Sequence, residues 1–380
     1  MILNNVEEEY TFDEDEFFGL KLDKEDEAND TKKNNNSCDY KQIRSYYILE
    51  IILGLLNKGR ILDLMKYNKN LKNKYKESDI FTKEDYLKYC SPIKIKIIPH
   101  KKSKEGKFIN ISEKDKKYFH IFFNGINKEI NNIYLNNNHN VNSIIVFIDK
   151  EISSFKGLFE SCRVIKSLEF IDFERINITD MSKMFKFCFD LKHLNFNKFN
   201  SSNTTDMSNM FNSCHNLTKL DLSNFDTKKV INMSGMFKDC TSLIELNLSN
   251  INTDKVTNMS GMFENCTSLI ELDLSNISTD KVINMKDMFS RCLSLKEINL
   301  SKFNTKNVED ISGMFYECKN LENIDISHFN IDRLRSVYSL FCACSNLKKV
   351  KTPNFYSILF LPGLEDIYKG TRKTLEIIRK

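Results

Sequence analysis

A strict 26-residue repeat runs through this 380-residue chain from about residue 144 to residue 355. Residues 233–246 read MSGMFKDCTSLIEL and residues 259–272 read MSGMFENCTSLIEL, so the apolar letters persist while the charged letters change. The same phenylalanine recurs at Phe159, Phe185, Phe211, Phe237, Phe263, Phe289, Phe315 and Phe341. A cysteine follows three residues later in every copy, at Cys162, Cys188, Cys214, Cys240, Cys266, Cys292, Cys318 and Cys344. Eight copies in register predict a repeat array with these residues as its shared core.

Each copy contains two apolar patterns. Leu220 and Leu222 alternate with polar residues, which predicts a short strand with one buried face. In DMSNMFNSC, Met207, Phe211 and Cys214 lie on the apolar stripe expected of about two helical turns. One copy cannot bury its own apolar side, but stacked copies can. The expected fold class is therefore an α/β repeat: a solenoid with a parallel β-sheet on its concave face and helical turns opposite.

The repeat LTKLDLSNFDTKKVINMSGMFKDC resembles the 26-residue bacterial surface-protein repeat of the BspA-like class of leucine-rich repeats. The resemblance covers about residues 144–355 and is carried by the pattern MF-x-x-C-x-x-L-x-x-L-x-L. It implies a leucine-rich-repeat solenoid for residues 141–355, with eight repeats. It also implies that a cell-surface adhesin is one of the functions open to the chain.

The N-terminal quarter differs from the repeats. Residues 1–30 carry twelve acidic and two basic residues, so we expect residues 1–38 to form a disordered acidic tail. Residues 39–90 are expected to be helical, because apolar residues recur there at helical spacing. Within them, residues 42–75 weakly resemble an F-box, although the usual Leu-Pro opening is absent. The other interpretation is a helical cap or a small dimerising hairpin.

Two further elements are expected to flank the array. Alternating segments in residues 91–140 predict a small β-rich module, which completes a small α+β region before the repeats. Residues 143–149, SIIVFID, fall in register with the repeats and are expected to form the first solenoid strand. Residues 356–380 are expected to form an amphipathic capping helix, with an apolar face made of Leu364, Ile367, Tyr368, Leu375 and Ile378.

Motifs for catalysis or metal binding are missing from the sequence. The recurrent cysteines are spread along a line, whereas tetrahedral zinc needs four ligands converging on one point. The six histidines are scattered, without the spacing of known metal motifs. We therefore expect no enzyme activity, no cofactor and no metal, and we interpret the cysteines as small core residues.

The outward positions of the predicted strands are the candidate partner-binding residues. They are Glu169, His193, Lys219, Asp221, Glu245, Asn247, Glu271, Asp273, Glu297, Asn299, Asn323 and Asp325. Acidic residues dominate the central copies, so we predict that this face binds a basic protein segment. The alternative is that these side chains are only solvated. Nucleic acid is not expected as a partner, because the lysines of the following turns lack interleaved aromatic residues.

These patterns favour a non-catalytic protein-protein interaction scaffold. The alternatives are an F-box-like substrate receptor of a ubiquitin ligase and a BspA-like cell-surface adhesin. The N-terminus lacks the basic-then-apolar pattern of a secretory signal, and the longest apolar run, residues 47–56, is too short to cross a bilayer. We therefore expect a cytoplasmic protein without membrane insertion.

Overall fold

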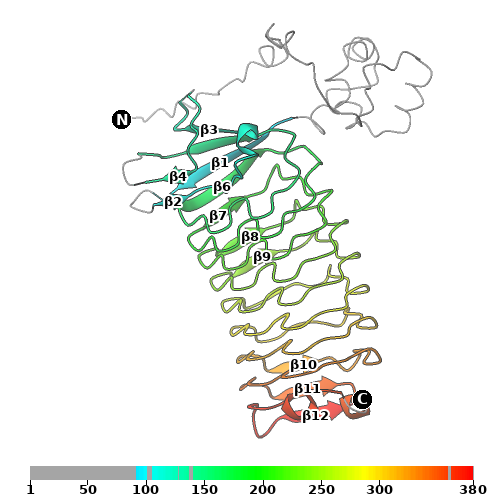
Figure 1. Ribbon diagram of the computed structural model, residues 1–380. Helices are drawn as coiled ribbons and strands as arrows, with labels where there is room; N and C mark the ends of the chain where they lie inside the picture. The colour runs from blue at the N-terminus through cyan, green and yellow to red at the C-terminus, as the bar shows by residue number, and fades with distance from the viewer. Residues whose placement is uncertain (1–90, 101–104, 127, 137–139, 358–360, 380) are drawn as a thin grey trace, which may run out of the picture.

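The protein is a β-solenoid preceded by a small β-rich module (Figure 1). The computed structural model describes residues 91–100, 105–126, 128–136, 140–357 and 361–379. About eight coils stack into a nearly straight column, with the β-rich module at one end and the C-terminus at the other. The predicted acidic tail and helical region, including the F-box-like residues 42–75, lie outside the described residues.

A five-stranded sheet joins the β-rich module to the first two coils. Its order is β3-β5-β1-β6-β7. The bounds are β1 Ile93–Pro99, β3 Phe119–Phe123, β5 Ile144–Ile148, β6 Ile165–Asp172 and β7 His193–Asn195. A two-stranded sheet of β2 (Gly106–Lys107) and β4 (Tyr134–Leu135) and a 3-10 turn, η2 (Lys116–Tyr118), complete the module.

The expectation that residues 143–149 form the first solenoid strand is wrong. These residues form β5, but β1 lies between β5 and β6 and pairs antiparallel with both. The sequence IKIKIIP alternates apolar and basic residues, and Ile93, Ile95 and Ile97 are fully buried. Residues 143–149 keep the period of the repeat, but this period does not show which strand pairs with them. It therefore could not reveal that β1 is inserted between β5 and β6.

Within the array, the Leu-x-Leu segments form short parallel strands. These are β7, β8 (Lys219–Asp221), β9 (Glu245–Asn247), β10 (Asn323–Asp325) and β11 (Lys349–Thr352). Parallel pairs bring equivalent residues of successive coils together, such as Leu220 with Leu246. We call the outward surface of these strands, from β6 to β11 and including the equivalent residues of the coils between β9 and β10, the strand face.

The helical turns expected in each copy are not helices. In the second coil, the N–H groups of Met181, Lys183 and Phe185 donate to carbonyls of the next coil, at 2.9, 2.9 and 2.8 Å. The N–H groups between them close tight turns, as from Met184 to the Met181 carbonyl. Lys183 has a φ of 58°, which a right-handed helix cannot accommodate. The positive φ recurs four residues later, at Phe187. The buried side chains of Met181, Phe185 and Cys188 therefore keep the spacing expected of a helix.

A second ladder runs along these turns. Isolated parallel bridges join equivalent residues of successive coils, namely Ser154, Asp180, Asp206, Asn232, Asn258, Asn284, Asp310 and Ser336. Side-chain oxygens support the chain at this ladder, as where Asp206 accepts the N–H of Ser208 at 2.8 Å. We call this surface the turn face. The α part of the expected α/β class is therefore wrong for the described residues, which contain strands, turns and 3-10 turns.

Stacked phenylalanines fill the interior of the column. The eight recurrent phenylalanines are fully buried, and neighbouring rings lie 5.4 to 5.8 Å apart with interplanar angles of 13° or less. Ring pairs of this kind stabilise beyond their buried area. One aromatic column therefore runs through every coil.

The recurrent cysteines are buried thiols that bond to the backbone. The Cys240 Sγ donates to the Phe211 carbonyl of the preceding coil at 3.1 Å. Every other recurrent cysteine from Cys188 to Cys344 makes the same bond. Burial raises the pKa of Cys240 to about 12. In the described part of the chain, no three His, Cys, Asp or Glu side chains gather as a metal site.

The predicted C-terminal capping helix is also wrong. Residues 361–379 form a last partial coil that contains η4 (Leu364–Asp366) and β12 (Glu376–Arg379), after the short η3 (Phe355–Ser357). The strand β12 pairs parallel with β11, and Tyr368 stacks on Phe341 at 5.9 Å. The open ladder of the preceding coil offers hydrogen bonds that a helix would leave unmade, as between Phe341 N and the Ile367 carbonyl at 2.9 Å.

Breaking the aromatic column should destabilise the array strongly. We expect Phe263→Ala to cost about 3–5 kcal/mol, because the ring is fully buried between Phe237 and Phe289. Ile283→Ala is the matched control, since its side chain is 45% exposed, and it should cost at most about 0.5 kcal/mol. Urea unfolding followed by circular dichroism measures both, and similar midpoints for the two variants would contradict the buried stack.

Thiol reactivity should distinguish the buried cysteines from Cys342, which is half-buried. With a pKa of about 12, only on the order of 10⁻⁴ of the Cys240 thiol is ionised at pH 8. We expect Cys342→Ser to remove one fast-reacting thiol in a titration with Ellman's reagent. Cys240→Ala should leave the number of fast thiols unchanged, and the loss of a fast thiol in that variant would argue against its burial.

Candidate functional site

The strand face carries two outward columns of side chains. The first column is Ser167, His193, Lys219, Glu245, Glu271, Glu297, Asn323 and Lys349. The second is Glu169, Asn195, Asp221, Asn247, Asp273, Asn299, Asp325 and Lys351. Strand pairing aligns them coil by coil, as Lys219 with Glu245 and Asn323 with Lys349. All twelve predicted partner-binding residues lie in these two columns.

The second column mainly holds the turn that follows each strand. The side-chain oxygen of Asp221 accepts the N–H of Ser223 at 2.9 Å, and Asn195, Asn247, Asp273, Asn299 and Asp325 repeat this bond. The bond from the Ser275 N–H lowers the pKa of Asp273. Burial opposes ionisation of Asp325, yet bonds from Ser327 and Lys351 outweigh it and lower its pKa to about 2. These residues are therefore structural as well as exposed.

The first column provides the carboxylates that are available to a partner. Lys219 forms an ion pair with Glu245 at 2.6 Å, and Lys349 forms one with Glu376 at 3.3 Å. Among the described residues, Glu271 and Glu297 form no ion pair. Three glutamates therefore follow one another in the centre of the face, and two of them lack a counter-charge.

The strand ladder is interrupted at these glutamates. No backbone hydrogen bond joins residues 244–248 to 270–274, or 270–274 to 296–300, although all of them are described. The inward residues of this stretch, Leu246, Leu272 and Ile298, are only partly buried. Leu220 and Ile324 of other coils are 4% and 5% exposed, whereas Leu194 of the paired strand β7 is also partly buried, so burial alone does not mark the interruption. We call the stretch from 244 to 300 on this face the glutamate seam.

Like charges lie opposite each other along the glutamate seam and oppose strand pairing there. Equivalent residues of stacked strands lie about 4.8 Å apart, and like charges directly opposite each other destabilise a ladder. The oppositely charged neighbours Lys219 and Glu245 lie in paired strands. Charge does not account for every interruption, because the segments of His193 and Lys219, and those of Glu297 and Asn323, also share no sheet. The second column alternates Asp and Asn from 221 to 325 and so avoids adjacent like charges.

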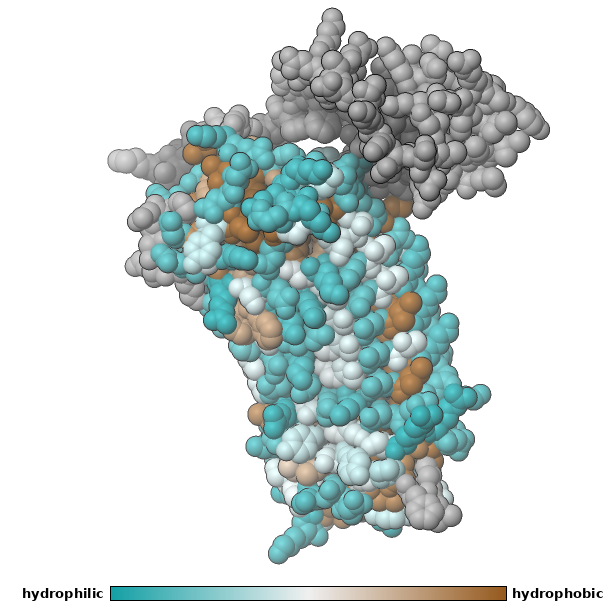
Figure 2. Space-filling view, in the orientation of Figure 1, coloured by the Kyte–Doolittle hydropathy of each residue, from teal (hydrophilic) through white to brown (hydrophobic). Residues whose placement is uncertain are grey.

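Two apolar side chains adjoin the glutamates and were missed by the sequence interpretation. Ile244 and Ile270 directly precede Glu245 and Glu271 and are 51% and 50% exposed. Most of the surface in Figure 2 is hydrophilic, and the column has two further exposed isoleucines, Ile231 and Ile283, at 47% and 45% exposure. The sequence could have revealed Ile244 and Ile270, because the equivalent residues of other copies are polar: Lys192, Thr218, Lys296 and Glu322.

A rim of exposed lysines lies apart from the strand face, in the turns that follow the strands. It consists of Lys228, Lys229, Lys255, Lys281 and Lys306. Lys229 donates to the side chain of Asn203 in the preceding coil. The acidic centre and the lysine rim are therefore separate surfaces of the same coils.

Removing the repulsion should close the glutamate seam. Glu271→Lys places a cation between Glu245 and Glu297, so we expect slower amide hydrogen exchange at residues 270–274 and a gain of about 0.5–1 kcal/mol in unfolding free energy. Lys219→Glu is the reciprocal variant and should speed exchange in β8 and β9. Unchanged exchange in both variants would show that charge does not open the ladder.

Comparison with known proteins concerns the repeats. No curated protein matches the chain. None of the described residues belongs to a helix with the length and hydrophobicity that crossing a bilayer requires. Residues 153–252 and 241–354 match the family described as "Mycoplasma protein of unknown function, DUF285". Because these matches together span more than half of the chain, the protein belongs to this family.

Proposed function

We propose that the protein is a non-catalytic interaction scaffold whose strand face binds a basic protein segment. The observation that carries this proposal is the glutamate seam, where Glu271 and Glu297 lack ion-pair partners among the described residues beside the half-exposed Ile244 and Ile270. Charge of one sign next to exposed apolar area suits a partner that presents cations and apolar side chains together.

The stacked coils support this role physically. The turn-face ladder and the buried aromatic column hold the coils in place beneath the strand face, so a partner would order few protein groups on binding. A cationic segment laid along the first column would also reduce the repulsion between Glu245, Glu271 and Glu297. Binding and ladder closure would then favour each other. The leucine-rich-repeat assignment of the BspA-like type is part of this proposal, because repeats of that class present an extended binding surface.

Charge reversal tests the proposed surface. We expect the Glu271→Lys/Glu297→Lys double variant to weaken binding of a fluorescent peptide of alternating Lys and Leu at least about tenfold in fluorescence anisotropy. The matched control is Lys255→Glu/Lys281→Glu on the lysine rim, which should not weaken binding. Added salt should weaken binding to the unaltered chain, since the attraction is electrostatic. Equal affinity of both double variants for the peptide would reject the strand face as the site.

A cell-surface adhesin is the second candidate, and the resemblance to BspA-like repeats favours it. A cytoplasmic scaffold and an adhesin differ in whether intact cells expose the protein. Antibody staining of unpermeabilised cells distinguishes them, with staining after permeabilisation as the control. Surface staining would support the adhesin and reject the cytoplasmic location.

A further inference from the structure

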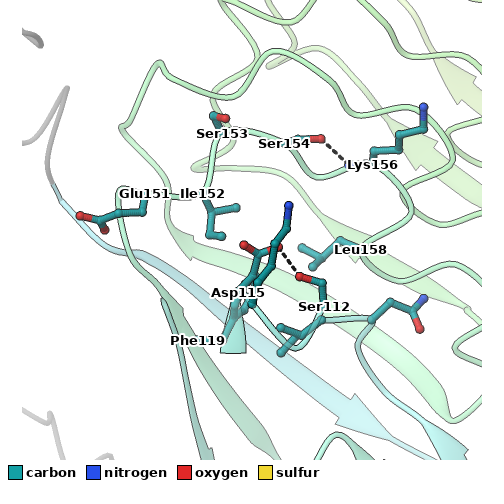
Figure 3. Close-up of a pocket in the computed structure, with 12 residues that line it drawn as sticks. Ser112, Asp115, Phe119, Glu151, Ile152, Ser153, Ser154, Lys156 and Leu158 are labelled. Carbon is teal, nitrogen blue, oxygen red and sulfur yellow. Dashed lines mark hydrogen bonds between the residues drawn. The ribbon is translucent and has the colours of Figure 1, made fainter. Parts of the chain in front are cut away.

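A pocket lies where the β-rich module meets the first coil (Figure 3). It has a volume of about 460 Å³, within the range of ligand-binding pockets. Ile111 and Phe119 from the module and Ile152 and Leu158 from the first coil form its apolar part. Polar residues, among them Ser112, Asp115, Ser154 and Lys156, lie around them.

The pocket lies at the beginning of the turn-face ladder, and this ladder has a direction. Each coil donates N–H groups toward the C-terminal end and offers carbonyl groups toward the N-terminal end. Phe155 N donates to the Asp180 carbonyl at 2.8 Å, and Gly157 N donates to the Ser182 carbonyl at 2.9 Å. The coils that follow repeat this pattern, as from Met233 to Asn258 and from Gly235 to Ser260.

The first coil has no earlier coil to supply these donors, and the module replaces only half of them. Asn110 N donates to the Leu158 carbonyl at 2.7 Å, and its Nδ2 donates to the Glu160 carbonyl at 2.7 Å. The Ser154 and Lys156 carbonyls are equivalent to those of Asp180 and Ser182. They receive no hydrogen bond from the described residues, and both residues line the pocket.

We propose that this pocket binds a peptide segment that adds one more turn to the ladder. Its main-chain N–H groups would donate to the Ser154 and Lys156 carbonyls, as open ladder edges pair with extended chains. In the coils, the first donor is an apolar residue such as Phe155 or Met233, and its side chain is buried. The peptide therefore places an apolar side chain against Ile111, Ile152 and Leu158.

The second donor sets a further requirement. Gly157, Gly235 and Gly261 hold this position with a φ of 59°, and Lys183, Asn209, Asp287 and Ser339 hold it with a φ of 54° to 58°. Glycine and asparagine adopt this conformation most readily, so the segment with the least backbone strain has the form apolar–x–Gly or apolar–x–Asn. This ligand differs from the basic segment proposed for the strand face, and the two sites are on separate surfaces.

The probe is a fluorescent peptide, INMSGMF, which copies residues 231–237; in the protein, Met233 and Gly235 of this segment make both bonds to the next coil. It should bind the full chain in fluorescence anisotropy. The control peptide carries N-methyl groups on its third and fifth residues, which removes the two N–H donors. We expect this peptide to bind at least about tenfold more weakly. Equal binding of the two peptides would overturn main-chain pairing.

Two variants test whether the peptide binds in this pocket. Ser112→Trp fills the pocket from its rim and should abolish binding, whereas Ser249→Trp on the strand face should not, with circular dichroism confirming that both variants fold. Retained binding by Ser112→Trp would overturn the assignment to this pocket. Failure of the unmodified peptide to bind the full chain would also overturn the proposal, and this result is expected if another part of the same chain occupies the pocket.

Discussion

Hydrogen bonding between successive coils holds the column together and sets the register of every other contact. Each coil is too small to bury its own apolar side, and its backbone groups alternate between bonds within the turn and bonds to the next coil. This arrangement requires equivalent residues to superpose, which explains why the repeat keeps 26 residues without insertion. The aromatic column can form only because the register is conserved in this way.

Outward charges act on the strand ladder beneath them. Outward side chains of a solenoid are usually regarded as free to vary, but here they stack at the distance of neighbouring strands. The oppositely charged Lys219 and Glu245 form an ion pair and lie in paired strands. Between Glu245 and Glu271, where like charges lie opposite each other, no backbone hydrogen bond joins the two described segments. A binding surface of one charge on such a column would therefore oppose local pairing.

The backbone groups at the two ends of the column are paired in different ways. At the N-terminal end, Asn110 supplies a backbone and a side-chain donor to two carbonyls of the first coil and leaves two others to the pocket. At the C-terminal end, β12 and Tyr368 continue the strand ladder and the aromatic column for one more partial coil. Each cap reproduces part of a coil, because the exposed backbone groups at each end require bonds in coil register.

The amino-acid sequence was enough to predict the repeat length, the stacking into a solenoid, the short strands and the apolar positions of each copy. Strand and core positions could be predicted because alternation and burial recur eight times. The choice between a helix and consecutive turns at Met207 and Phe211 could not be made from the sequence, since both bury residues at the same spacing. Likewise, only the structure revealed the insertion of β1, the glutamate seam and the open carbonyls of Ser154 and Lys156. These features depend on which segments of the chain are neighbours in space. The spacing of residues within one copy of the repeat carries no information about those neighbours.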